Sequence, residues 1–378
     1  MNRENNESKI KEKKSLGIAL SGGGSRAIAF HLGCFRALND LGFLDKIDHM
    51  SSVSGGSVFS GLYNFYEESF ESFDDRVVEV LRKGLQNKVA KKYFFPTSII
   101  KSLGTTLISG VAARGSLIVG KTPPFTRWYS RTNAFIDVLE RDLFHGLTLQ
   151  SEVKNNIDVV INSCDLATGT AFRFGTKETG NWKLGRVNTN DIPVSEAVVC
   201  SAAYPFFLPA LDKYYEFEKA GKVFNERVYL TDGGVYDNSG VTCFDPNNDP
   251  KYSFNSFKPN FIFAFDAGHG IYGKKKHPYY MYSRLMESYS TTFKKRIDGI
   301  KKDLHQYLDH GRIQGFIYSY LGQNDMVLPS IPSDFITSDK VSSYPTDFKA
   351  MKEKNIELLA GRGEQLTRIL ISHYNPII

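Results

Sequence analysis

Ser54 is the residue whose surroundings in this sequence best suit a nucleophile. It lies in the segment Ser52-Val53-Ser54-Gly55-Gly56, where a plausible strand, Ile47–Val53, ends and helical spacing begins. A serine at such a sharp strand-to-helix turn is held in a strained conformation that exposes its hydroxyl, and small neighbours let a substrate approach. Ser52 replaces the first glycine of the usual G-x-S-x-G pattern but is still small. The segment predicts a nucleophilic serine, with an ordinary serine N-cap as the alternative.

A glycine-rich segment earlier in the chain could stabilise the negative charge that such a nucleophile creates. Three glycines follow the apolar run Leu16–Leu20, and backbone N–H groups of glycines are sterically open, as the donors of an oxyanion hole must be. An arginine just after them could add positive charge or tie the loop down. The expected oxyanion-hole segment is Gly22, Gly23, Gly24, Ser25 and Arg26.

The same glycines are also compatible with a different function, nucleotide binding. Gly22-x-Gly24-x-x-Ala27 fits the dinucleotide-binding fingerprint, and Asp45 lies about 20 residues on, where a ribose-binding acid belongs. The alternative function is therefore a nucleotide-binding oxidoreductase or NTP-binding module. It leaves Ser54 unexplained, and hydrolysis of p-nitrophenyl esters without added cofactor would separate the two functions.

A carboxylate stands in a third motif. Asp232 follows the short apolar run Val228–Leu230 and precedes Gly233 and Gly234, which is typical of a reactive or ligand-binding acid and also of a turn. The order Ser54, Asp232, His269 would in addition satisfy a serine–histidine triad, but an α/β-hydrolase usually places several strands before its nucleophile. Here only one strand precedes the strand that carries Ser54, and the eight histidines show no metal-type cluster.

The spacing of apolar residues predicts the elements that would position these groups. Two strand–turn–helix units in the first 70 residues indicate an α/β fold of three layers, with a mainly parallel central sheet flanked by helices. We expect residues 1–14 to be a flexible tail and residues 15–378 to be one domain, with helical insertions near 70–130 and 270–330. The predicted strands are Leu16–Leu20, Ile47–Val53, Ile157–Asn162, Val228–Leu230 and Phe261–Phe265, and a helix is predicted over Asp347–Tyr374.

Taken together and in this order, the three motifs resemble those of the patatin-like phospholipase family. Two further segments agree: Asp165-Leu166-Ala167-Thr168-Gly169 is similar to the family's D-L-x-T-G turn, and residues 201–209 are similar to its A-S-x-A-x-P-x-F-x-P segment. The resemblance runs from about Leu16 to about Gly270. The combination is specific, although each motif alone is not.

The resemblance implies a lipid acyl hydrolase of phospholipase A type that works with a Ser–Asp dyad. Ser54 would attack the ester carbonyl and form an acyl-enzyme, and Asp232 would be its base. Ser52, Gly55, Gly56, Gly233 and Gly234 would support the two turns, and no metal or organic cofactor is implied. Stand-alone enzymes of this kind also resemble phospholipase effectors of bacterial anti-phage systems, which implies a cyclic-nucleotide activator as a further expectation.

Composition and charge fit this expectation without proving it. The 378 residues carry a net charge of +6, which favours anionic surfaces but does not require a nucleic-acid polymer. The four cysteines show no disulfide framework, and the polar N-terminus resembles neither a secretory signal nor a membrane span. We therefore expect a cytoplasmic protein that contacts membrane phospholipid transiently, at the inner membrane face. Basic clusters at Lys274–Lys276 and Lys294–Arg296 are either solvated faces or contacts for phosphate-bearing ligands.

One apolar stripe lies in the first insertion. Ile100, Leu103, Leu107 and Val111 recur at helical spacing. Such a stripe usually packs on the core, but over a lipid site it could also form a lid or an interfacial helix.

Overall fold

The structure is a computed structural model that describes residues 14–119, 123–188, 191–269 and 277–378. All of the expected N-terminal tail except Lys14 lies outside the described residues, and so does the basic cluster Lys274–Lys276.

The described strands form one sheet in the order β10-β9-β1-β2-β3-β4-β5-β6-β7-β8. The first five of these are parallel, whereas every pairing from β3 through β4 to β8 is antiparallel. The strands are β1 (Leu16–Leu20), β2 (Ile47–Val53), β3 (Asp158–Asp165), β4 (Thr170–Gly175), β5 (Thr179–Asn181), β6 (Gly185–Val187), β7 (Leu211–Lys219), β8 (Lys222–Asp232), β9 (Phe261–Asp266) and β10 (Gly315–Tyr320).

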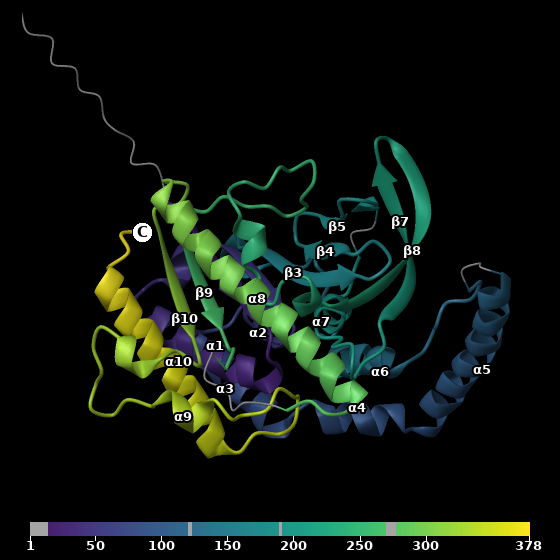
Figure 1. The fold of residues 1–378 in the computed structure, drawn as a ribbon, viewed down its shortest axis with the longest axis horizontal. Coiled ribbons are helices and arrows are strands. Elements are labelled where there is room, and N and C mark those ends of the chain that lie inside the picture. Colours follow the sequence, from purple (N-terminus) through teal and green to yellow (C-terminus); the bar gives the residue numbers. More distant parts are fainter. Residues whose placement is uncertain (1–13, 120–122, 189–190, 270–276) are drawn as a thin grey trace, which may run out of the picture.

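Helices cover both faces of the parallel part of the sheet, because its strands are apolar on both sides. In β9, for example, Phe261, Phe263 and Phe265 belong to one core cluster, and Ile262 and Ala264 belong to the other. The first cluster packs against α1, α2, α3, α7 and α10, and the second lies under α8, which crosses β9 and β10 in Figure 1. The helices are α1 (Gly24–Asp40), α2 (Gly55–Asn64), α3 (Phe70–Lys83), α4 (Gln86–Tyr93), α5 (Pro96–Val119), α6 (Arg131–Leu139), α7 (Val194–Ser201), α8 (Met281–Asp309), α9 (Ser338–Val341) and α10 (Glu353–Tyr374).

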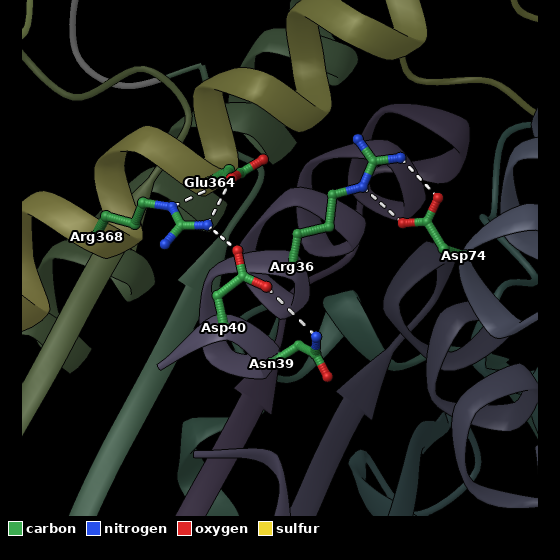
Figure 2. A network of polar contacts seen from close by, with 6 residues as sticks. All are labelled: Arg36, Asn39, Asp40, Asp74, Glu364 and Arg368. Atoms are coloured by element: carbon green, nitrogen blue, oxygen red, sulfur yellow. Dashed lines mark hydrogen bonds and ion pairs between the residues drawn. The ribbon is translucent and has the colours of Figure 1, made fainter. Parts of the chain in front are cut away.

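Ion pairs join α1 to its two neighbouring helices at the rim of this layer (Figure 2). Arg36 of α1 donates two hydrogen bonds to Asp74 of α3, at 2.6 and 2.7 Å. On the other side, Asp40 of α1 pairs with Arg368 of α10, which also contacts Glu364. Such partly exposed pairs contribute about 0–1 kcal/mol each, so they orient the helices and the buried apolar residues supply most of the stability.

The architecture confirms the predicted α/β fold. The predicted and observed elements differ mainly in the polar segments of the chain. The predicted strand Val228–Leu230 is the buried end of the longer β8, and β10 lies in the 270–330 segment, which was expected to be helical and holds α8. The strands β4–β7 were not expected at all. β6 and β7 carry exposed charged residues such as Arg186 and Glu218, and β4 and β5 are short, so that these strands contain no long apolar run.

Candidate active site

Two strand ends meet head to head on β3, and this arrangement brings the candidate nucleophile and base together. One edge of β3 pairs with β4 along residues 160–165. The other edge pairs with β2 up to Val53, opposite Asn162, and then with β8 from Asp232, opposite Ser163. Because β2 and β8 run toward each other, Ser54 leaves the sheet where β8 ends. Asp232 therefore lies beside Ser54, although almost half of the chain separates the two residues in the sequence.

Ser54 occupies a strained turn between β2 and α2. Its backbone has φ 53° and ψ −118°, a conformation in which a residue with a Cβ is rarely found. The Ser54 N–H donates to Ser201 Oγ at 2.9 Å, and Ser57 Oγ lies 2.9 Å from the same hydroxyl and donates to Ser52 Oγ at 3.2 Å. This chain of hydroxyls holds the turn from β2, α2 and α7. The Ser54 side chain itself is hydrogen-bonded to the Asp232 carboxyl.

The Asp232 carboxyl has the electrostatics of a base rather than of an ordinary surface acid. It is almost completely buried, and this burial raises its pKa from 3.8 to about 7. Two hydrogen bonds oppose the rise, one from the Gly234 N–H at 2.7 Å and one from the Ser54 side chain. A carboxylate in contact with a serine hydroxyl and with a pKa near neutrality can accept the serine proton.

The turn after Asp232 is built to keep this contact short. A Cβ on Gly233 would overlap the carbonyl oxygen of Asn162 on β3, and a Cβ on Gly234 would lie 2.9 Å from Asp232 Oδ1. Glycine at both positions therefore lets β8 stay paired with β3 without such an overlap. The predicted supporting role of Gly233 and Gly234 thus has a steric reason.

The glycine loop lies beside Ser54, between β1 and α1. A Cβ on Gly22 would lie 3.1 Å from Ser54 Cβ, and one on Gly55 would overlap the Gly24 carbonyl. Gly24 also has φ 60° and its missing Cβ leaves room for the Asp347 carbonyl, so that another residue would be strained there. Gly56 is packed in the same way against the end of β1, with Leu20 O only 2.6 Å from its missing Cβ.

The backbone donors of this loop are not equivalent. The Gly22 N–H donates to Asn238 O at 3.1 Å and the Ser25 N–H donates to Asp347 O at 2.7 Å. These two groups are engaged within the protein. Of the expected donors, Gly23 and Gly24 are therefore better placed to hold an oxyanion, at the N-terminus of α1.

Arg26 ties the loop down. Its Nε donates to Ala267 O at 2.9 Å, and Nη1 donates to Tyr344 O at 3.0 Å and contacts the ring of His269. Burial lowers the pKa of Arg26 to about 10, and the nearby charge of Asp266 opposes this shift. The guanidinium thus joins α1 to the carboxyl end of β9 and to the segment before α10, and it supports the glycine loop.

The topology of the sheet is inconsistent with a dinucleotide-binding site at the glycine loop. A ribose-binding acid must lie at the same sheet edge as the glycine loop, which follows the carboxyl end of β1. Asp45 lies in the turn Leu44–Lys46 before β2, and β1 and β2 are parallel. It is therefore at the opposite edge of the sheet, where it accepts a hydrogen bond from Asn155 at 3.3 Å.

Histidine and metal candidates are not gathered at this site. His269 contacts Arg26, and the two hydrogen bonds at Asp232 come from Gly234 and Ser54. His31 is buried under the glycine loop, where burial lowers its pKa to about 4 and its Nε2 lies 3.0 Å from Ser21 O. Within the described residues there is no group of three or more histidine, cysteine or acidic side chains that could hold a metal ion.

Several residues of the site were not predicted from the sequence. Asn238 places its Oδ1 between Gly22 and Gly234, and Asn162 donates to Ser52 O at 3.0 Å and to Ser51 Oγ at 2.9 Å. Both are polar residues in segments without a chemical motif of their own. Only the buried position of Asn162 in an apolar strand could have marked it, since buried polar side chains need partners.

The D-L-x-T-G segment is a structural turn next to the site. Asp165 Oδ1 accepts hydrogen bonds from the Ala167 N–H at 3.2 Å and the Tyr229 N–H at 3.0 Å, and Oδ2 accepts the Thr168 hydroxyl at 2.7 Å. The carboxylate thereby ties the β3–β4 turn to β8. This contact helps to hold β8 against β3, and with it Asp232.

A group of aromatic side chains lies near Asp232. Tyr204 and Phe206 lie after α7, and their rings are 6.0 and 5.7 Å from that of Tyr289 on α8. Burial raises the pKa of Tyr204 and the charge of Asp232 raises it further, which puts this ring beside the carboxylate. Phe207 and Tyr282 extend the group and are exposed.

The second basic cluster and the apolar stripe are both on the surface. Lys294, Lys295 and Arg296 are exposed on α8, as expected for a solvated face. The stripe 100–111 lies on α5 and is exposed, so the prediction of a core-packed helix is wrong. Among the residues that the structure describes, no helix combines the length and the apolar character needed to cross a bilayer.

Comparison with solved structures gives several matches of low sequence identity. Human GIVD cytosolic phospholipase A2 in complex with methyl gamma-linolenyl fluorophosphonate matches with a TM-score of 0.51 and 13% identity, over 96% of this chain and 58% of that one. VipD from Legionella pneumophila has a TM-score of 0.38 and 13% identity, over 96% and 67%. This chain spans only 45% of another structure of the human enzyme, at a TM-score of 0.44 and 12% identity. A search of curated proteins gives no match.

A match between the sequence and a family model identifies the protein family. The sequence matches the description "Patatin-like phospholipase" over residues 18–245, which contain Ser54, Asp232, the glycine loop and the D-L-x-T-G turn. The 133 residues that follow this match supply β9, β10, α8 and α10 to the same sheet and its helical layers. The chain belongs to the patatin-like phospholipase family.

Proposed function

We propose that this protein is a serine acyl hydrolase that cleaves the acyl esters of membrane phospholipids, with Ser54 as nucleophile and Asp232 as base. The observation that carries the proposal is the contact between a serine in a strained turn and a buried carboxyl whose pKa is raised to about 7. An isolated acid would be ionised and weakly basic at neutral pH. A pKa near 7 makes the carboxylate a far better acceptor for the serine proton.

The proposed reaction has two halves. In the first, the Ser54 hydroxyl attacks the ester carbonyl while its proton moves to Asp232, and the N–H groups of Gly23 and Gly24 stabilise the oxyanion. The tetrahedral intermediate then expels the alcohol, a lysophospholipid, which takes the proton from Asp232 as it leaves. In the second half, Asp232 accepts a proton from the water that attacks the acyl-serine, and it returns this proton to Ser54 Oγ as the fatty acid leaves, so that the Ser54 hydroxyl and the Asp232 carboxylate are both restored.

The surroundings of the dyad support a lipid as substrate. The aromatic group Tyr204, Phe206 and Tyr289 gives an acyl chain an apolar surface beside Asp232. The human phospholipase of similar fold was solved with a fluorophosphonate that carries a linolenyl chain, so the same class of reagent is a suitable probe here. The four cysteines are buried and free, which fits action in a reducing compartment, at the inner face of the membrane.

A fluorophosphonate probe and lipid analysis test this function together. The wild type should be labelled at Ser54 and should release fatty acid and lysophospholipid from phospholipid vesicles. Ser54→Ala should lose both properties while it keeps the folded structure. Labelling at a different serine, or equal lipid release by Ser54→Ala, would contradict the proposal.

A cyclic-nucleotide activator stays a prediction that follows from the family resemblance. The described basic cluster on α8 is exposed rather than gathered in a pocket, so it gives this prediction no further support. The measurement is ester hydrolysis with and without cyclic nucleotides. A rate that does not change would remove the reason for expecting a regulatory ligand.

A further inference from the structure

Helix α5 has its apolar face on the outside. The helix extends away from the body of the protein at the right of Figure 1. Its residues Ile100, Leu103, Leu107 and Val111, at spacings of three or four, form one stripe and are 70, 58, 65 and 67% exposed. A stripe of this kind on a helix in water normally faces a core. On α5 it faces away from the protein.

The opposite face of α5 is polar and is the covered one. Thr105 is fully buried and Ser116 is nearly so. Ser109 and Ser116 donate their hydroxyl hydrogens to the carbonyls of Thr105 and Ala112, one turn earlier, and so their polar groups need no water. The usual distribution for a helix in water is thus reversed, and the outer face of α5 calls for an apolar partner.

The base of α5 is fixed to the protein on two sides. The hydroxyls of Ser98 and Tyr129 are 3.0 Å apart, and those of Tyr93 and Ser102 are 2.7 Å apart. The chain that returns from α5 is held by Arg227, which donates to Phe125 O at 2.9 Å and to Pro123 O. Arg227 in turn pairs with the buried Asp212 at 2.6 Å. The helix is therefore held in place at its base.

The net charge of the segment that contains α5 indicates which kind of partner the apolar face of α5 contacts. Residues 80–136 contain no aspartate or glutamate and ten lysines and arginines, against a net charge of +6 for the whole chain. Four of the ten pair with acids elsewhere, for example Lys88 with Asp142 at 2.9 Å. Lys91, Lys101 and Arg114 are exposed on α4 and α5 themselves. Such a surface attracts a layer of anionic headgroups.

Exposed aromatic side chains complete the pattern around the base of α5. Phe94 and Phe95 follow α4, and Phe125 and Trp128 lie on the returning chain. Trp128 packs against Gly104 of α5, with its ring 3.8 Å from the position of a Cβ there. Aromatic rings prefer the boundary between headgroups and acyl chains, where an amphipathic interfacial helix also lies.

We propose that α5 is a membrane-docking arm, which inserts the face formed by Ile100, Leu103, Leu107 and Val111 into the headgroup boundary of an anionic bilayer. This inference rests on the proposed function in so far as it brings a lipid hydrolase to its substrate. The arm holds the enzyme at the surface, and Lys91, Lys101 and Arg114 contact the phosphates. A second copy of the chain could also cover an apolar face, but residues 80–136 carry too much charge of one sign for a symmetric contact with themselves.

Cosedimentation with vesicles tests the arm. The protein is mixed with vesicles of phosphatidylglycerol and phosphatidylethanolamine in about equal parts, or with vesicles of phosphatidylcholine alone. The wild type should bind the anionic vesicles and prefer them. Leu103→Asp with Leu107→Asp should weaken this binding at least about ten-fold. Val223→Asp with Val327→Asp, two exposed apolar residues outside the arm, is the matched control and should bind like the wild type.

Hydrolysis of a soluble p-nitrophenyl ester separates this inference from the proposed function. The arm variant should keep the wild-type rate within about two-fold, since α5 does not contribute to the dyad. If no protein hydrolyses the ester, the enzymatic proposal fails and sedimentation still judges the arm. Should the arm variant fail to fold, the triple variant Lys91→Gln, Lys101→Gln and Arg114→Gln replaces it and should lose the preference for anionic vesicles.

Two results would overturn the docking arm. One is a folded arm variant that binds anionic vesicles as tightly as the wild type. The other is a wild type that is a dimer by size-exclusion chromatography while the arm variant is a monomer and binds vesicles unchanged, because the face would then be covered by a second copy of the chain.

Discussion

Replacing Asp232 with asparagine should stabilise the protein at neutral pH, and the gain should disappear in acid. Asparagine keeps the size of the side chain and an oxygen that can accept the Gly234 N–H, but it carries no charge. The pKa of Asp232 is about 7 in the folded protein against 3.8 for an unperturbed carboxyl. Three pKa units at 1.4 kcal/mol each correspond to a free energy of about 4 kcal/mol.

The sign follows from which state holds the proton more tightly. A raised pKa means that the folded state keeps the proton of Asp232 after the unfolded state has released it. The wild type therefore loses stability from this group as pH rises from about 4 to about 7, and above pH 7 the full cost remains. The free energy of unfolding of Asp232→Asn should exceed that of the wild type by about 4 kcal/mol at pH 8 and by close to nothing at pH 4.

Urea denaturation of both proteins at several pH values measures this difference. Asp298→Asn, which removes an exposed carboxylate on α8, is the matched control and should give a nearly flat difference. If the difference between Asp232→Asn and the wild type were equally flat, Asp232 would be an ordinary acid. The electrostatic reason for choosing it as the base would then be lost, whatever the activity of the variant.

The remaining predictions concern the same site. The kcat/KM for a soluble ester should rise about ten-fold per pH unit below pH 7 and level off above it, because only the ionised Asp232 is a base; a profile independent of pH from 5 to 8 would contradict this. Ser54→Ala should reduce turnover by about a thousand-fold or more, and adding Asp232→Asn to it should cost little further, since the two groups act as a unit. Ser54→Gly should be about 1 kcal/mol more stable to urea than Ser54→Ala, because φ 53° and ψ −118° strain a residue with a Cβ. His269→Gln should keep turnover within about ten-fold, a barrier change of about 1.4 kcal/mol; a folded but inactive His269→Gln would make imidazole the base.

The buried parts of the fold were predictable because their physics is local. β1 and β9 coincide with apolar runs, to within a residue, since strands buried on both faces are mostly apolar. The outer half of β8 is not visible in this way. Its residues, such as Glu226, stand in a hairpin with water on one side, and only the partner strand β7 makes them a strand.

The residues of the candidate site also differ in whether the local sequence could predict them. Ser54 and the glycine loop could be found because a sharp turn after a strand limits which residues fit. Asn238, Ser57 and Ser201 could not, since their partners lie far away in the sequence and a lone polar residue in a loop or helix has no pattern of its own. The direction of α5 was also out of reach, because spacing identifies an apolar stripe but not what it faces.

The head-to-head meeting of β2 and β8 also determines when the enzyme can first become active during its own synthesis. Asp232 emerges from the ribosome 178 residues after Ser54. At ordinary rates of translation that interval lasts roughly 10–35 s. Throughout it, the nascent chain presents a serine without a base. Even then the base arrives only when β8 has docked on the last three residues of β3, a contact that forms across a large sequence separation and hence late. With the proposed dyad, the chain therefore cannot hydrolyse a lipid ester until β8 has docked on β3.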